Sequence, residues 1–417
     1  MKIICNFLAA TFIILAFSCS TKEQIAEDAT SKDDPYTDKI ASMDPEEKLN
    51  VFAFNMYEEI LKNVDDNLVI SPFSISTAMA MTYGGSGEET KDQMSKTLLF
   101  DRDMENFHKE FNEHVKMLEE LAEEDIEFNI ANGMWLQHDY PFLESYIETI
   151  QKYYGPVLHE ADFKVDQEKE RKEINNWVSD KTNQKIEDLI SKGVLVKDTR
   201  LVIVNAIYFL SNWLEEFDKE LTRKRDFHID EETTVETEFM RKDDTFKYFE
   251  DEHAQVLEIP YSGEDFSMML ILPRENLGLS EFEAKLDNKK YEKYTDSLSK
   301  NEVNLLFPKF KMRSKANLEG LLTQMGMPQA FSNKADFSRM TSEDDLKIDQ
   351  VIHEAFIEVD EEGTEAAAAT AVSIVVKSAR PDEERIIFRA DRPFKFFIKD
   401  NKTNTILFMG RVMDPAK

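Results

Sequence analysis

The sequence contains little cysteine, glycine and proline. Its 417 residues include 2 cysteines, 12 glycines and 12 prolines. Two cysteines exclude a scaffold held by several disulfides, and low glycine and proline argue against long disordered or collagen-like stretches. A hydrophobic content of 41% can form a substantial core. The length fits one large domain or two ordinary ones.

The sequence also lacks the residue patterns of hydrolytic and metal sites. It has no G-x-S-x-G turn, no H-E-x-x-H pair and no Cys-x-x-Cys. The histidines are scattered, and His108 and His114 lie in charged surroundings that predict ordinary surface residues. Gly84, Gly85 and Gly87 lack the Gly-Lys-Ser/Thr ending of a phosphate loop. We therefore expect no enzyme activity, no bound metal and no cofactor.

Positive charge is scarce relative to negative charge. Acidic residues outnumber basic ones 83 to 51, which gives a formal net charge of −32. Such a chain repels the phosphates of nucleic acids and the head groups of anionic lipids, so we expect no nucleic-acid partner. Solubility is the simplest explanation of the acidity.

The N-terminal 18 residues have the organisation of an export signal. Lys2 supplies one positive charge, and the apolar run from Phe7 to Phe17 is too short to span a bilayer with ease. The sequence AFSC that ends at Cys19 resembles a bacterial lipobox, which implies lipidation of Cys19 after removal of residues 1–18. An ordinary signal peptide with an incidental cysteine is the alternative. The lipobox predicts a lipid-anchored protein of the bacterial cell envelope, at the cell surface or in the extracellular space.

The remaining chain divides into a polar segment and a folded part. Residues 19–44 are nearly free of large apolar side chains and predict a flexible tether. Residues 45–417 predict one domain, which starts with an amphipathic helix near Pro45. A second helix is predicted to begin at Ser71-Pro72, an N-cap followed by a proline at the first helical position. Later helices and strands are mixed without βαβ regularity, which indicates an α+β fold.

The stretch from Glu361 to Ser378, EEGTEAAAATAVSIVVKS, alternates with a period of two. One face carries no charge and consists of Thr364, Ala366, Ala368, Thr370, Val372, Ile374 and Val376. This pattern predicts a strand with one side directed at a core, and an exposed alanine-rich helix is the alternative. Because the first side chains are small, such a strand could slide between two others.

The same stretch closely resembles the proximal hinge of inhibitory serpins, a family of suicide inhibitors of serine proteases. The family pattern E-E/K-G-T-E-A-A-A-A-T is matched throughout residues 361–370. Other segments resemble further serpin motifs: NLVISPFSI at 67–75, NAIYF at 205–209 with Trp213 and Phe217, PKF at 308–310, FRADRPF at 388–394 and LFMGRV at 407–412. Leu210-Ser211-Asn212 departs from the usual residues at that place. The resemblance implies a serpin fold with three β-sheets, eight to nine helices and an exposed reactive-centre loop at about 361–387.

The resemblance also implies a partner and a scissile bond. In the family this bond lies fourteen residues beyond the hinge glycine, which from Gly363 gives Lys377–Ser378. A lysine suits trypsin-like serine endopeptidases, whereas Val375 and Val376 would suit elastase-like enzymes. The segment after Lys377 is longer than in most serpins, and counting back from the C-terminal motif would move the bond to near Asp382.

Three groups of site residues follow from the resemblance. The hinge comprises Glu361, Gly363, Thr364, Ala366, Ala368 and Thr370. A hydrogen-bonded cluster beneath the place where the central sheet opens comprises Ser71, Ser74, Asn205 and His353. Trp213, Lys309 and Glu361 belong to the top of that sheet. The alternatives are a core histidine at 353 and a surface Lys309–Glu361 pair worth about 0–1 kcal/mol.

The function implied is a monomeric inhibitor that traps an acyl-enzyme when its cleaved loop inserts as a strand of the central sheet. Heparin is not expected as a cofactor, because the helix at residues 103–124 is acidic. A non-inhibitory serpin that acts as a surface binding module is the alternative, although such members usually carry bulky residues at the hinge. A hydrolase is disfavoured because no nucleophile–base pattern is present.

Overall fold

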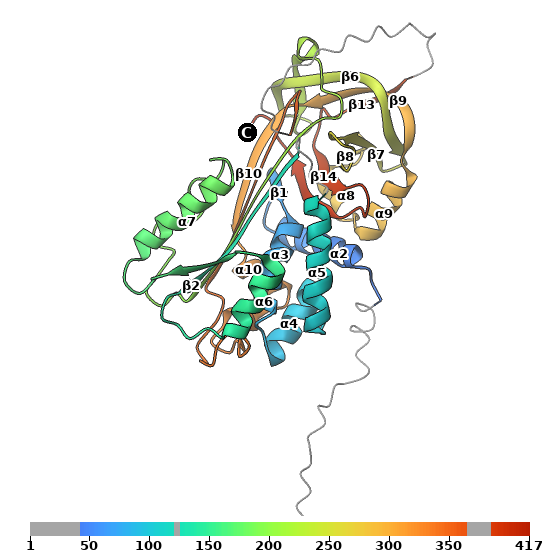
Figure 1. The fold of residues 1–417 in the computed structure, drawn as a ribbon. Helices are drawn as coiled ribbons and strands as arrows, with labels where there is room; N and C mark the ends of the chain where they lie inside the picture. Colours follow the sequence, from blue (N-terminus) through green and yellow to red (C-terminus); the bar gives the residue numbers. More distant parts are fainter. Residues whose placement is uncertain (1–41, 121–125, 365–384) are drawn as a thin grey trace, which may run out of the picture.

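The computed structural model describes residues 42–120, 126–364 and 385–417 (Figure 1). Cys19, the loop residues Ala366, Ala368 and Thr370, and the bond Lys377–Ser378 lie outside the described residues. The described ranges form nine α-helices and two 3₁₀-helices. The α-helices are α2 (Pro45–Leu61), α3 (Pro72–Tyr83), α4 (Glu88–Leu98), α5 (Met104–Glu120), α6 (Glu144–Tyr154), α7 (Gln167–Lys181), α8 (Leu279–Glu283), α9 (Asn288–Ser297) and α10 (Glu319–Met325). The 3₁₀-helices are η1 (Lys219–Leu221) and η2 (Pro328–Phe331).

A six-stranded sheet runs along the molecule in the order β10-β11-β12-β4-β2-β3. Its strands are β2 (Ile126–Gln137), β3 (Leu158–Ala161), β4 (Leu201–Asn212), β10 (Phe310–Asn317), β11 (Gln350–Val359) and β12 (Gly363–Thr364). One face of this sheet packs on the main core, and α7 lies on the outer face (Figure 1).

A nine-stranded sheet has the order β1-β15-β14-β8-β7-β6-β9-β13, with β5 also paired to β6. Its strands are β1 (Leu68–Ile70), β5 (Arg223–His228), β6 (Thr234–Glu250), β7 (Ala254–Pro260), β8 (Phe266–Pro273), β9 (Ser299–Pro308), β13 (Ile386–Arg389), β14 (Phe394–Asp400) and β15 (Ile406–Val412). The first part of β6 pairs with β5 and its last part with β7. This long strand therefore joins two of the three expected sheets into one hydrogen-bonded sheet. The mixture of helices with two mostly antiparallel sheets confirms the predicted α+β fold.

Helix α3 is the element that supports the six-stranded sheet from below. Its N-cap is Ser71, whose side chain accepts a hydrogen bond from the backbone N–H of Ser74, and Pro72 takes the first helical position, as the sequence predicts. All residues of α3 are buried, and the helix packs against β4, β15 and α2. Ser71 and Ser74 are therefore held directly beneath the sheet.

Strand β4 is buried on both faces, which explains its nearly continuous apolar sequence. Ile203 and Ile207 contribute to the main core, while Val204 and Tyr208 pack in the second cluster under α7. Most neighbours in this sheet are antiparallel, but β2 and β3 are parallel, and so are β4 and β11. They pair over seven residues, from Val202–Gln350 to Tyr208–Phe356.

Helix α5 corrects one expectation from the sequence. His108 was expected at the surface but is only 4% exposed, because it lies on the inward face of this amphipathic helix. Its Nδ1 is 2.8 Å from the Tyr154 hydroxyl, and burial lowers the pKa of His108 to about 4. His114 is half-buried on the same helix, and burial lowers its pKa as well.

Membrane-spanning helices were also sought. Across residues 42–120, 126–364 and 385–417, no helix combines the length and the apolar character that crossing a bilayer requires.

Candidate functional site

The candidate site begins where the chain turns back after β11. The Asp360 carboxylate accepts hydrogen bonds from the backbone N–H groups of Glu362 and Gly363 at 2.9 and 3.2 Å. This turn returns the chain as β12, which is antiparallel to both of its neighbours: Thr364 pairs with Val359 of β11 and with Ser211 of β4. A Cβ on Gly363 would lie 2.1 Å from the Ser211 carbonyl oxygen, so only glycine fits there.

Below β12 the strands β4 and β11 are in direct contact. We call their seven-residue parallel pairing, Val202–Tyr208 with Gln350–Phe356, the seam. β12 occupies the upper end of the space between the two strands, and the seam closes that space beneath it. The chain that follows Thr364 could continue as a strand only if the seam opened.

An upper anchor holds β12 through the side chains of Trp213 and Tyr261. The Trp213 backbone N–H donates to the Glu362 carbonyl, and its indole N–H donates to the Asp360 carbonyl, both at 2.9 Å. The Trp213 ring stacks on Tyr261 with centroids 4.7 Å apart. The Tyr261 hydroxyl is 2.6 Å from Oγ1 of Thr364, so the first buried side chain of β12 is directed at the core.

Glu361 makes a second set of contacts that stabilises the turn between β11 and β12. Its side chain is only 6% exposed and lies 2.9 Å from Nζ of Lys309. The Thr222 hydroxyl donates to the same carboxylate at 2.7 Å, and the Phe217 N–H donates to the Glu361 carbonyl at 2.8 Å. Burial alone would raise the pKa of Glu361, but the Thr222 hydrogen bond and the Lys309 ammonium hold it below its usual value. The Lys309–Glu361 contact is thus a partly buried pair and not an exposed one.

A lower cluster lies across the seam at His353 and Asn205, which are register partners. His353 Nδ1 is 2.5 Å from the Asn205 amide oxygen, and His353 Nε2 accepts from the Ser71 N–H at 3.4 Å. The Asn205 amide donates to the Ser74 hydroxyl at 2.5 Å and to the side-chain oxygen of Asn132. Full burial lowers the pKa of His353 to about 3, so the ring is neutral.

The structure brings the predicted residues together in two places and adds three others. Ser71, Ser74, Asn205 and His353 form the lower cluster, whereas Trp213, Lys309, Glu361, Gly363 and Thr364 gather around β12. Sequence reasoning missed Tyr261, Thr222 and Asn132. Asn132 had a usable signal, because a polar residue interrupts the apolar face of its strand, but Tyr261 and Thr222 had none.

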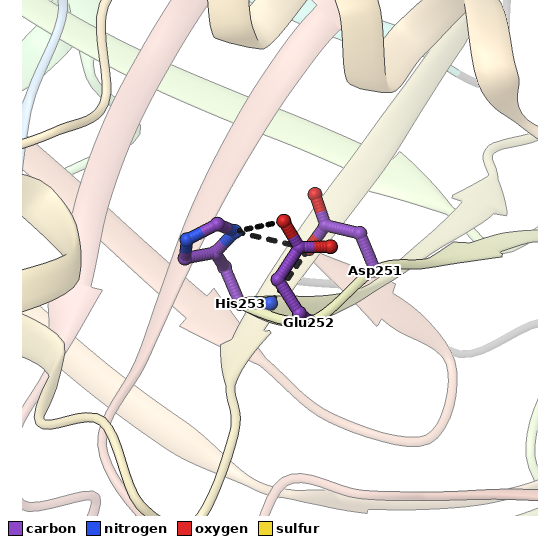
Figure 2. A group of neighbouring side chains, drawn as sticks. All are labelled: Asp251, Glu252 and His253. Carbon is purple, nitrogen blue, oxygen red and sulfur yellow. Dashed lines mark hydrogen bonds and ion pairs between the residues drawn. The ribbon is translucent and has the colours of Figure 1, made fainter.

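One group of side chains has the composition of a metal site. In the part of the chain that the structure describes, Asp251, Glu252 and His253 are the only group of three histidines or acids close enough to share an ion (Figure 2). The Asp251 carboxylate already accepts the backbone N–H groups of His253 and Ala254, at 2.9 and 3.0 Å. Because that carboxylate caps the turn from β6 to β7, we infer a structural role for it.

Comparisons with known proteins agree with this geometry. A family model described as serpin (serine protease inhibitor) matches residues 47–415. An uncharacterized serpin-like protein of Methanosarcina acetivorans is 37% identical, over 99% of this chain and 99% of its own. Human serpin B4 is 39% identical, over 87% of this chain and 97% of its own. Serpin48 of the insect Tenebrio molitor superposes with a TM-score of 0.79 at 32% identity, over 88% of this chain and 97% of that structure. Uncleaved ovalbumin superposes with a TM-score of 0.79 at 28% sequence identity, over 88% of this chain and 99% of that structure.

Proposed function

The chain belongs to the serpin family, and on that premise we propose that it is a suicide inhibitor of serine endopeptidases. The observation that carries the proposal is β12. Gly363 and Thr364 of the alternating segment already form a strand there: both pair with β4, and Thr364 also pairs with β11, antiparallel in each case. The same segment continues in sequence with an uncharged face of small residues, which suits further entry between the two strands.

The register of β12 fixes where further residues would lie. Each later residue would face one residue earlier on both β4 and β11. β4 and β11 keep the same register along the seam, from the pair Val202–Gln350 to the pair Tyr208–Phe356, and up to Thr364, which pairs with Ser211 and Val359. By this count Thr370 would lie between His353 and Asn205, in place of the hydrogen bond that now joins them. Insertion would thus replace one parallel ladder by two antiparallel ones.

The energy of insertion is large enough to drive the mechanism. Fourteen residues from Thr364 to Lys377 would span roughly 45 Å as a strand. At about 0.5–1.5 kcal/mol for each new hydrogen bond, they would contribute roughly 7–20 kcal/mol. This equals the whole stability of an ordinary domain, which is enough to deform an attached enzyme.

The covalent chemistry in this proposal belongs to the protease. Its serine attacks the carbonyl carbon of Lys377, the peptide bond to Ser378 breaks, and the Ser378 amine leaves with a proton from the protease histidine. The Lys377 acyl group then stays on the enzyme unless water removes it. Insertion of the cleaved loop carries the acyl-enzyme away before that hydrolysis. A trypsin-like pocket suits Lys377, while Asp382 marks the alternative position of the bond.

The N-terminal segment indicates where the proposed inhibitor would be located in the cell. A lipid on Cys19 would tether a monomeric inhibitor to the envelope of a bacterial cell through the polar residues up to 44. The acidic excess of the chain, which has a net charge of −32 over all its residues, would repel the folded domain from an anionic bilayer and favours a domain held away from the lipid surface.

The experiment that tests the proposal is a reaction with trypsin, followed by electrophoresis in SDS and sequencing of the released C-terminal fragment. We expect an SDS-resistant complex and a fragment that starts at Ser378. Trypsin with a blocked catalytic serine is the control and should give no complex. Complete cleavage without a complex, or no reaction with a panel of trypsin-like and elastase-like enzymes, would favour a non-inhibitory binding module.

A further inference from the structure

Three aromatic side chains, which we call the aromatic cluster, attach helix α7 to the edge of the six-stranded sheet. Trp135 of β2 and His159 of the edge strand β3 are register partners, and their rings stack with centroids 4.5 Å apart. Trp177 of α7 meets both rings edge to face, at 5.0 Å from Trp135 and 5.2 Å from His159. Gly133 leaves room for the indoles, because a Cβ there would lie 2.5 Å from the Trp135 ring.

The aromatic cluster lies in the part of α7 that covers the sheet. Ile174 and Val178 of α7 belong to one apolar cluster with Val204 of β4 and Ile352 of β11, on the outer face of the sheet (Figure 1). Trp177 directly precedes Val178 and packs against the same apolar cluster. If the Trp177 contacts were lost, this turn of the helix would therefore lose part of its attachment to the sheet.

His159 is the member of the aromatic cluster that can change its charge. The residue is half-buried, and its Nε2 atom is buried without a hydrogen-bond partner in the described ranges. A neutral ring can leave this nitrogen unprotonated and carry its proton on Nδ1. An imidazolium carries a hydrogen on both nitrogens, so it would place a buried N–H at Nε2 without an acceptor. The packed cluster therefore accommodates the neutral ring and disfavours the charged one.

The surroundings of the ring do not compensate a positive charge. Burial lowers the pKa of His159, and Lys181 in the last turn of α7 lowers it further by repulsion. Glu173 and Asp180 of the same helix are exposed, and Glu173 pairs with Lys169 at 3.3 Å. Helix α6 also contacts β3, but its buried residues belong to the main core on the other face of the sheet. The positions beside the ring on the same face of β2 and β3 are uncharged: Gly133, Gln137, Val157 and Ala161.

We propose that the aromatic cluster is a pH-sensitive latch, which holds α7 on the sheet near neutral pH and loosens in mild acid. An imidazole in solvent binds a proton near pH 6.5, whereas the packed His159 does so only at lower pH. A fall in pH below 6.5 therefore favours the form with this ring in solvent, in which Trp135 and Trp177 lose their shared contact. The latch is a property of the uncleaved protein, so its test does not depend on the proposed inhibition.

Tryptophan emission tests the opening of the cluster, because an indole that becomes exposed to water emits at longer wavelength. Trp135 is only 5% exposed, and the chain contains 3 tryptophans, two of which contact His159. We expect a shift to longer wavelength that begins below pH 6.5 in the natural protein and is absent in His159→Phe, which keeps an aromatic ring. His138→Gln, which removes an exposed histidine, should retain the shift.

Two outcomes of this titration overturn the latch. One is a shift of the same size in the natural protein and in His159→Phe. The other is a loss of intensity without a shift, which would mean that the imidazolium stays packed on the indole faces and is stabilised by them. His159→Gln should also lack the shift, and it keeps the comparison valid if the phenylalanine variant fails to fold.

Hydrogen exchange tests whether the cluster controls α7. The amides of Asn175–Lys181 should exchange faster in the natural protein than in His159→Phe, and this ratio of rates should be about threefold or more larger at pH 5 than at pH 7.5. Comparing two proteins at one pH cancels the chemical pH dependence of exchange, and the amides of α2 should show no such change. An unchanged ratio in α7 overturns the latch. A changed ratio in a protein that traps no protease would reject the proposed function and leave this inference intact.

Discussion

His353 is a histidine that the fold keeps neutral at the centre of the seam. Burial lowers its pKa to about 3, compared with an ordinary value of 6.5. The unfolded chain gains a proton at this residue as the pH falls through 6.5, and the folded chain does not until near pH 3. This histidine therefore reduces the stability of the fold as the pH falls between these values, by about 1.4 kcal/mol per pH unit.

A histidine variant makes this residue's pH dependence measurable. The free energy of unfolding, from urea titrations at pH 6 and pH 5, should fall by roughly 1 kcal/mol more for the natural protein than for His353→Gln. The comparison cancels the contributions of the carboxylates and of His108, since both proteins contain them. Equal changes in the two proteins would mean that His353 is already accessible to protons in the folded state.

Glu361 connects the turn before β12 to Lys309 and Thr222. Glu361→Ala should lower the free energy of unfolding by about 1–3 kcal/mol, because the Thr222 hydroxyl and the Lys309 ammonium lose a shared acceptor. Thermal melting measures the effect. Glu358→Ala is the matched control, because Glu358 pairs with Lys311 at 3.1 Å in a more exposed position. It should change stability by less than about 0.5 kcal/mol, and a similar loss in both variants would remove the special role of Glu361.

At the scale of the element, the seam is the place where our proposal inserts the loop as a new strand. By the register of β12, Ala368 would lie between Ala355 and Ile207, both fully buried. Glu365 would lie on the opposite face, between Glu358 and Leu210, which are half-buried. The two faces of the entering strand therefore meet different surroundings, and this difference can be tested.

Ala368→Glu should convert the proposed inhibitor into a substrate. Cleavage happens before insertion and should continue at its normal rate, but a glutamate on the core face would cost several kcal/mol to bury and adds no cleavage site for trypsin. Trypsin would then cleave the variant and be released, which electrophoresis in SDS shows as cleaved protein without complex. Glu365→Gln is the control and should form complex in nearly full yield. A full yield of complex from Ala368→Glu would exclude insertion in this register.

The sequence predicted the structure best where the residues of a single helix, strand or turn are enough to specify its conformation. The α3 cap at Ser71-Pro72, the apolar strand β4 and the glycine at 363 were predictable, because local chemistry or close approach requires those residues. Contacts between distant segments were not: Tyr261 meets Thr364 only through the packing of two sheets. The inward position of His108 was missed because its charged neighbours in sequence lie on the other side of the helix.

At the scale of the whole molecule, our proposal assigns the N-terminal segment a function separate from that of the folded domain. Cys19→Ser should move the protein from the membrane fraction to the soluble fraction of the cell, since the lipid is the anchor in our proposal. Fractionation followed by immunoblotting measures this. A variant that stays in the membrane pellet would contradict the lipid anchor but would leave the inhibitory mechanism untouched.

The central claim is that the cleaved loop enters the seam, and the melting temperature before and after cleavage tests it most directly. A protease that cuts the loop without being trapped supplies the cleaved form, and calorimetry compares it with the intact protein. An added strand worth roughly 7–20 kcal/mol predicts a rise on the order of 10–25 °C for a domain of this size. A cleaved protein that melts at the same temperature as the intact one, or below it, would contradict insertion.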